Sequence, residues 1–109
     1  MTTIALLHKH YDEQHLEEVK TEMASLGAPV IRCIWSELNN MWMAVEGSHR
    51  IRAAKDLDLM PIITDITNQK YAVVQIDNEN IKINVKKYAS ELQDDLYQTD
   101  YIDFDEEEE

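Results

Sequence analysis

Cysteine, glycine and proline are scarce in this chain of 109 residues, which contains one, two and two of them. The single Cys33 cannot close an intramolecular disulfide or supply a cysteine-rich zinc site, so we expect neither kind of cross-link. No apolar run approaches the roughly 18 residues that a membrane-spanning helix needs, and no basic stretch followed by an apolar segment opens the chain. We therefore expect a cytoplasmic protein that is stabilised by packing, and the apolar content of 44% suffices for one core.

Basic residues are also few, 10 against 22 acidic ones, and the formal net charge is −12. All the bases and twelve of the acids lie in positions 1–90, whereas the last nineteen residues contain ten acids and no base. A protein that wraps duplex DNA needs a basic surface, so this charge argues against that class. Segment 98–109 has too few apolar groups to compact against its own repulsion, and we expect it to be a disordered acidic tail.

Hydrophobic periodicity predicts a mixed α+β fold, a small mixed sheet with packed helices, in a single domain over residues 1–97. Asp12 is a candidate N-cap for a helix that ends at Gly27, because apolar residues recur at intervals of three and four between them. Further helices are predicted at 51–57 and 86–97. Strands are predicted at 2–7 (at a sheet edge), 29–35, 41–45, 59–63, 71–76 and 81–85, the last two as a hairpin.

The segment Gly47-Ser48-His49-Arg50 lies at the predicted corner between a strand and a helix, and it has a physical mechanism for binding an anion. Glycine allows a tight turn, Ser48 is a candidate cap, and the N–H groups of the first helical turn have no intrahelical partners. Arg50 offers a bidentate guanidinium, and His49 offers a further donor. The alternative interpretation is an ordinary capped helix with a solvated Arg50.

The surrounding segment 43–63, MAVEGSHRIRAAKDLDLMPII, resembles the signature segment of the ParB/sulfiredoxin superfamily. Members have a strand, a Gly-x-His/Arg-Arg turn, a helix with Ala-Ala and a strand that follows a Leu-x-x-Pro-Ile-like motif. The resemblance covers residues 12–66. It implies a ParB/sulfiredoxin-like fold and a turn that binds nucleotide phosphates, CTP in ParB proteins and ATP in sulfiredoxin and a related free-serine kinase.

Carried over residue by residue, the resemblance assigns ligand binding to Gly47, Ser48, His49 and Arg50, and Arg52 matches the second arginine of the ParB-type motif. It also implies ATP or CTP with Mg²⁺ as the ligand. The chain departs from both prototypes. Ser48 stands where sulfiredoxin has its reactive cysteine, so sulfinic-acid reduction is not expected. Nothing after residue 70 resembles the DNA-binding domain of ParB.

Further hypotheses concern side chains outside the Gly47–Arg50 corner. Glu46, beside the corner, is a candidate general base or metal-bridging carboxylate, against the simpler interpretation of a solvated acid. No metal site is predicted, because His8, His10 and His15 lack a fourth ligand and are expected at the surface. Cys33 is expected to be a buried, unreactive side chain. The aromatic and methionine side chains at 35 and 41–43 are expected in the core rather than stacked on a base.

Two classes of function follow from these features. The first is a module that binds a nucleotide or another phosphate-bearing ligand at the Gly47–Arg50 corner, with phosphotransferase or NTPase activity left open. The alternative is an acidic interaction or inhibitor protein, of a phage-borne and nucleic-acid-mimicking kind, which occupies a basic partner protein through its tail and surface. In a third arrangement the tail folds back onto Arg50 and Arg52 and competes with the phosphate ligand.

Overall fold

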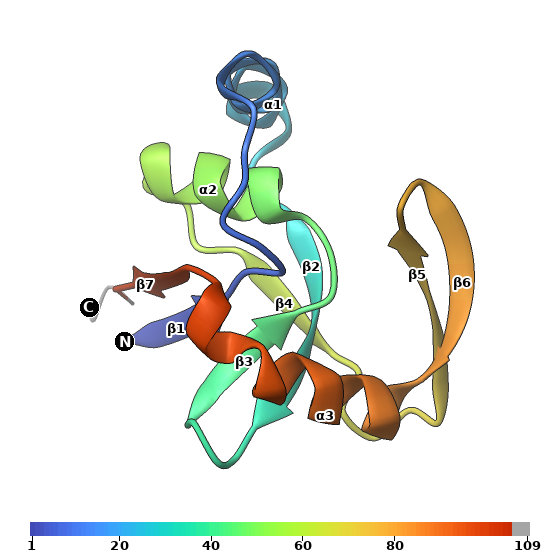
Figure 1. Ribbon diagram of the computed structural model, residues 1–109. Coiled ribbons are helices and arrows are strands. Elements are labelled where there is room, and N and C mark those ends of the chain that lie inside the picture. Colours follow the sequence, from blue (N-terminus) through green and yellow to red (C-terminus); the bar gives the residue numbers. More distant parts are fainter. Residues whose placement is uncertain (106–109) are drawn as a thin grey trace.

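Residues 1–105, which the computed structural model describes, form a central sheet of five strands: β1 (Thr2–Ala5), β2 (Val30–Ser36), β3 (Met41–Ala44), β4 (Ile62–Asp65) and β7 (Tyr101–Phe104). Their order across the sheet is β4-β2-β3-β1-β7 (Figure 1). β1 is parallel to β3 and β2 is parallel to β4, whereas β2 runs antiparallel to β3 and β1 antiparallel to β7. The sheet is therefore mixed, and the predicted α+β class is confirmed.

Helix α1 (Glu13–Leu26) begins and ends where its local signals predict. The Asp12 side chain caps it by accepting a hydrogen bond of 2.8 Å from the backbone N–H of His15. At the other end Gly27 has a φ of 84° and donates its N–H to the carbonyl of Met23. The predicted helix is thus confirmed at both termini.

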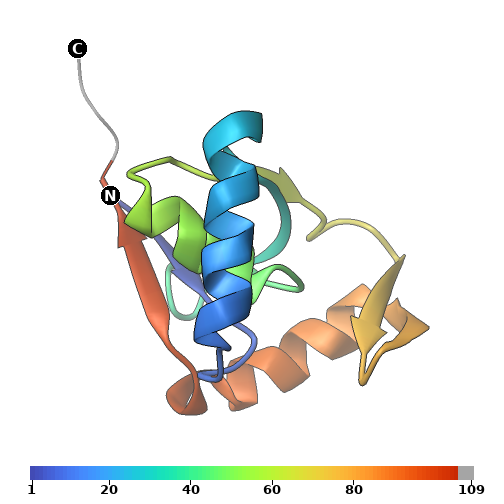
Figure 2. The ribbon, with the colours of Figure 1, turned by 90° about the horizontal axis from the view of Figure 1, so that it is seen from above.

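Helix α2 (Ser48–Asp56) covers one face of the sheet, and α1 packs across α2 on the outside (Figures 1 and 2). Ala53 and Ala54 are fully buried, because small side chains let α2 approach the strands closely. Asp58 takes the left-handed conformation that ends the helix, with a φ of 57°, and the N–H of Leu59 bonds back to the carbonyl of Ala54. Aspartate here occupies the helix-ending position at which glycine is usual.

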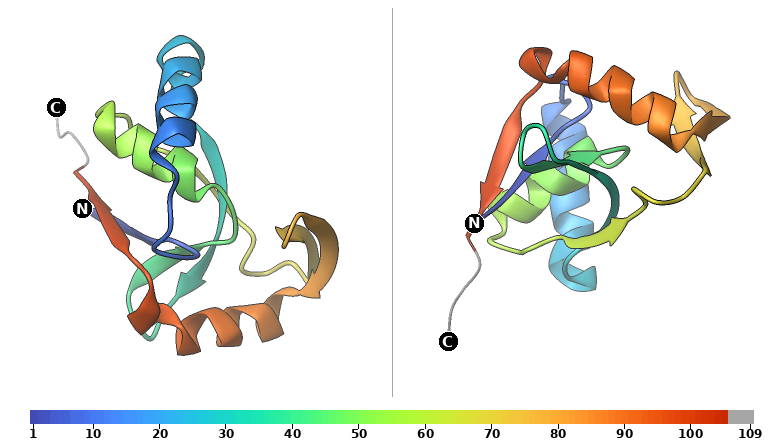
Figure 3. Two further views of the ribbon diagram at one scale, coloured as in Figure 1. Left: turned by 45° about the horizontal axis from the view of Figure 1, so that its top comes forward. Right: turned by 90° about the horizontal axis from the view of Figure 1, so that it is seen from below.

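A third helix covers the opposite face, and a hairpin lies beside the sheet (Figure 1). The hairpin joins β5 (Tyr71–Ile76) to β6 (Glu79–Asn84) through Asp77 and Asn78, whose φ values of 50° and 66° suit a two-residue turn. Helix α3 (Val85–Asp94) follows at once, runs below the sheet and leads into a short 3₁₀ turn at Leu96–Gln98 (Figure 3). A second apolar cluster forms between these elements and the sheet. Its buried members are Ala5, Ile34, Met43, Val45, Ile66, Val74, Val85 and Leu96.

The prediction of a disordered tail from residue 98 is wrong over Tyr101–Phe104, which forms β7. This strand pairs with β1, with Ile102 opposite Ile4, and only 4% of Phe104 is exposed. Two apolar residues alternate with the acids, so one side of the strand is apolar and packs onto the core. β1 is consequently an internal strand rather than the predicted edge. The rest of that prediction, residues 106–109, lies outside the described residues.

The predicted strand at 59–63 begins later than expected, at Ile62, because the residues before Pro61 belong to the helix end. None of the helices formed by residues 1–105 combines the length and the apolar character needed to span a bilayer.

Candidate functional site

A cleft of about 750 Å³ opens beside the strand-to-helix corner that the sequence singles out. Three walls enclose it: one side of α1 with the loop that follows it, the N-terminus of α2, and the β5–β6 hairpin. The lining residues that matter for its chemistry are His8, His15, Leu26, Pro29, Arg32, Glu46, Gly47, Ser48, His49, Arg50, Val73, Gln75 and Asn80. A volume of this size lies within the range of small-molecule sites, about 300–1,000 Å³.

Gly47 turns the chain into α2 in a way that other residues would resist. Its φ is 73°, and a Cβ built on it would lie 2.8 Å from Cδ1 of Ile31 and 3.1 Å from Nη2 of Arg50. Gly47 is also the N-cap, and no side chain caps this helix. The expectation that Ser48 is the cap is therefore wrong, because Ser48 is already the first helical residue.

The first turn of α2 presents polar hydrogens that have no partner in the part of the chain that the structure describes. The helical bonding begins at Ile51, whose N–H donates to the carbonyl of Gly47 at 2.9 Å, so the helix gives no acceptor to the N–H groups of Ser48, His49 and Arg50. Ser48 is only 6% exposed, yet its Oγ has no hydrogen-bond partner among residues 1–105. An unpaired buried hydroxyl is costly unless something supplies an acceptor or donor, so this end of the cleft suits an anion.

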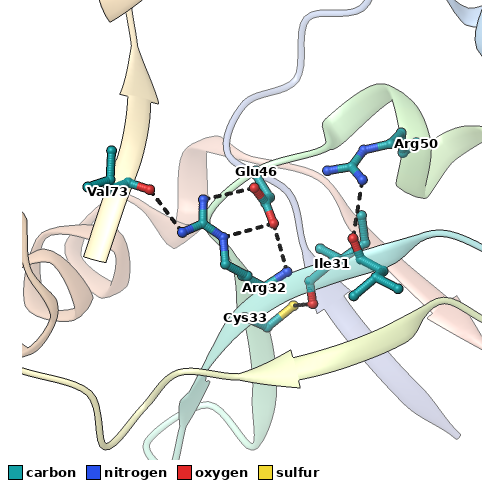
Figure 4. A network of polar contacts seen from close by, with 7 residues as sticks. Ile31, Arg32, Cys33, Glu46, Arg50 and Val73 are labelled. Atoms are coloured by element: carbon teal, nitrogen blue, oxygen red, sulfur yellow. Dashed lines mark hydrogen bonds and ion pairs between the residues drawn. The ribbon is translucent and has the colours of Figure 1, made fainter. Parts of the chain in front are cut away.

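Arg50 lies against the same corner (Figure 4). Its Nη1 donates to the carbonyl of Val30 at 3.2 Å, and the guanidinium packs over Gly47. A guanidinium has five N–H donors, and this contact uses one. Arg50 therefore lines the cleft with a positive charge and with donors left for a ligand.

Glu46 is held by Arg32 rather than free in the cleft (Figure 4). Its Oε2 accepts bonds of 3.0 Å from both the backbone N–H and Nε of Arg32, and its Oε1 accepts one of 2.9 Å from Nη2. Burial by itself would raise the pKa of Glu46, but the hydrogen bonds and charge of Arg32 outweigh it and lower that pKa. The candidate general base is therefore a paired carboxylate that stabilises the strand ends.

His49 accepts a hydrogen bond instead of offering one at Nε2. The backbone N–H of Asp12 donates to this atom at 2.9 Å, which leaves the ring proton of the neutral form on Nδ1. The ring of His15 lies edge-on to it at 4.6 Å. Burial lowers the pKa of His49, and the neighbouring His15 and His8 lower it further. His49 is thus a neutral residue at neutral pH that joins α2 to the start of α1.

The structure separates Arg52 from the other predicted site residues. Its Nη2 donates to Oδ2 of Asp100 at 2.7 Å and to the carbonyl of Lys9 at 3.1 Å, and its guanidinium lies 4.5 Å from the ring centre of Tyr11. Two residues along a helix correspond to about 200° of rotation, so Arg50 and Arg52 leave α2 on different sides. Arg52 holds the segment before β7 and lies outside the lining of the cleft, and its part in ligand binding stays a prediction.

The remaining candidates lie apart from the α2 end of the cleft. Trp35 and Trp42 pack edge-on across β2 and β3 at 5.0 Å and do not line it. Cys33 is fully buried, and burial raises its pKa to about 12, as expected for an unreactive thiol. Among residues 1–105 no cluster of three or more histidine, cysteine or acidic side chains is arranged to hold a metal.

The hairpin wall is the part of the cleft that sequence reasoning missed. Val73 and Gln75 alternate correctly for one face of a strand, and Asn80 lies opposite Gln75 in the register. This signal is visible in the sequence, but nothing local says that the hairpin faces α2. Comparisons with models of known families, with curated proteins and with solved structures find no match to this chain.

Proposed function

We propose that the cleft binds a phosphate-bearing small molecule, with its phosphate at the N-terminus of α2. The observation that carries the proposal is Ser48 Oγ, a hydroxyl buried without a partner in the first turn of a helix that lines the cleft. A nucleotide such as ATP or CTP is the ligand favoured by the resemblance of segment 43–63 to the ParB/sulfiredoxin superfamily.

Each residue of the corner contributes a different contact to the phosphate. The N–H groups of Ser48, His49 and Arg50 and the positive end of the helix dipole favour an anion, and Ser48 Oγ–H supplies a further donor. The free N–H groups of Arg50 add a charge-assisted contact. His49 contributes its backbone N–H rather than a cationic ring.

The proposal is one of binding. Glu46 is occupied by Arg32, and no metal-binding cluster occurs within residues 1–105, so Mg²⁺ would enter only with a nucleotide. Catalysis would need a base that the corner does not offer.

The alternative function, an acidic protein that occupies a basic partner, has less support from the fold. Ile102 and Phe104, two apolar residues of the predicted tail, pack against the core instead. In the third arrangement the tail would fold back onto Arg50 and Arg52. Asp100 does pair with Arg52, but neither residue of that pair lines the cleft.

Calorimetric titration with pyrophosphate, ATP, CTP and GTP, each with and without magnesium, tests the proposal. A hydrogen bond to a charged group contributes about 1.5–3 kcal/mol, so Ser48→Ala is expected to weaken binding by at least about tenfold, and Arg50→Ala by a similar factor. Ser48→Ala should not destabilise the protein, because it removes an unpaired buried hydroxyl.

Ser90→Ala, on the exposed side of α3, is the matched control and should leave both affinity and stability unchanged. Absence of binding by all four compounds, or wild-type affinity in both corner variants, would refute the proposal.

A further inference from the structure

The wall of the cleft opposite α2 carries a pair of free carboxamides. Gln75 on β5 and Asn80 on β6 are directly opposite each other in the hairpin, both are exposed, and both line the cleft. Neither side chain has a hydrogen-bond partner among the residues that the structure describes. Opposed residues of an antiparallel pair have Cβ atoms about 4.5–5.5 Å apart, so the two amides can act on one ligand group.

A network of bonds holds this wall in place across the cleft. Nη1 of Arg32, on β2, donates to the carbonyl of Val73 on β5 at 2.9 Å, two residues from Gln75 (Figure 4). The Nε and Nη2 atoms of the same guanidinium are bound to Glu46, the residue before Gly47. Arg32 therefore links the hairpin, through Val73, to the residue that leads into the Gly47–Arg50 corner. This link fixes the position of one wall of the cleft relative to the other.

Apolar side chains border the space between these walls. Leu26 at the end of α1 is 82% exposed and Val73 on the hairpin is 52% exposed, and both line the cleft. Exposed apolar groups that share a concave site favour a ligand with apolar surface of its own. A cleft of about 750 Å³ also has far more space than a phosphate group needs.

We infer that the β5–β6 hairpin recognises the part of the ligand beyond its phosphate, and that Gln75 and Asn80 are the residues that determine specificity there. The group that fits is a planar ring with donors and acceptors on one edge and apolar faces, the chemistry of a nucleobase. A carboxamide donates and accepts at once, which suits the edge of such a ring, and Leu26 and Val73 contact its faces. This inference rests on the proposed function, because it assumes that the phosphate lies at α2.

The test compares pyrophosphate and ribose 5-phosphate with ATP, CTP, GTP and UTP in calorimetric titrations of the full chain. At least one nucleotide is expected to bind tenfold or more tightly than pyrophosphate. In the double variant Gln75→Ala/Asn80→Ala this preference should fall below about threefold while pyrophosphate affinity stays constant.

The double variant Gln14→Ala/Asn68→Ala is the matched control. Both residues are exposed and lie outside the lining of the cleft, so the nucleotide preference should persist. A second pair of changes, Gln75→Glu and Asn80→Asp, preserves shape and replaces the amide donors. It should alter the order of preference among the four nucleotides.

The outcomes separate the two proposals. Nucleotides that bind no more tightly than pyrophosphate, or a preference that survives both carboxamide variants, would overturn the role of the hairpin and leave phosphate binding at α2 intact. If pyrophosphate and all four nucleotides fail to bind, both proposals are overturned.

Discussion

The pair between Arg32 and Glu46 allows one prediction to be worked out from its geometry. Glu46 accepts three hydrogen bonds of 2.9–3.0 Å from Arg32. Glu46→Gln keeps the shape but replaces one oxygen with an NH₂ group that faces donors. A bond to a charged group contributes about 1.5–3 kcal/mol, and the two side chains are 32% and 28% exposed, so we expect a loss of about 2 kcal/mol.

The pH dependence of this loss follows from the direction of the pKa shift. The pKa of Glu46 is lowered in the folded protein from its ordinary value of 4.5. Its stabilisation is therefore fully present above that value and is lost as the pH falls through the lower, folded pKa. The difference between wild type and Glu46→Gln should be largest at neutral pH and should shrink as the pH falls through the lowered pKa of the folded protein.

Urea unfolding followed by circular dichroism, at pH 7 and at about pH 3, measures both effects. At pH 7 the melting temperature of the variant should also be about 8 °C lower. Glu37→Gln, at an exposed turn, is the control and should change the free energy of unfolding by less than about 0.5 kcal/mol. A Glu46→Gln variant as stable as this control, or an equal deficit at both pH values, would show that the ion pair does not stabilise the corner.

Three further predictions concern the corner and the last strand. Gly47→Ala should cost about 2–3 kcal/mol in thermal or urea unfolding, because it combines a positive φ with a contact of 2.8 Å; a cost below about 1 kcal/mol would contradict the close approach. Phe104→Ala should destabilise by about 3 kcal/mol, since its ring is buried against the core, and an unchanged unfolding midpoint would mean that β7 is not part of the fold. The pKa of His49 is lowered from 6.5, so its stabilisation is present above that pH and is lost as the pH falls below it. The wild type should therefore lose more stability than His49→Gln between pH 7.5 and 5.5, and identical pH profiles of the unfolding free energy would contradict the shift.

Local signals in the chain were enough to locate several elements and the strand-to-helix corner at Gly47. Asp12 and Gly27 mark the ends of α1 because capping depends on residues within one helical turn. The alternation in β5 and β6 predicts their hairpin for the same reason, since the turn residues bring neighbouring segments together. Gly47 at a strand-to-helix corner likewise indicates a tight turn from the sequence alone.

Contacts between distant residues decided the rest. The acidic composition predicted a disordered tail, but residues 101–104 pair with β1 instead. Two basic residues of α2 also hold this segment: Arg52 pairs with Asp100, and Lys55 donates to the carbonyl of Asp103 at 2.6 Å. The same pairing holds Arg52 outside the lining of the cleft. The cleft itself needs α1, α2 and the hairpin together, and composition or periodicity carries no information on how a hairpin packs against a helix far away in the chain.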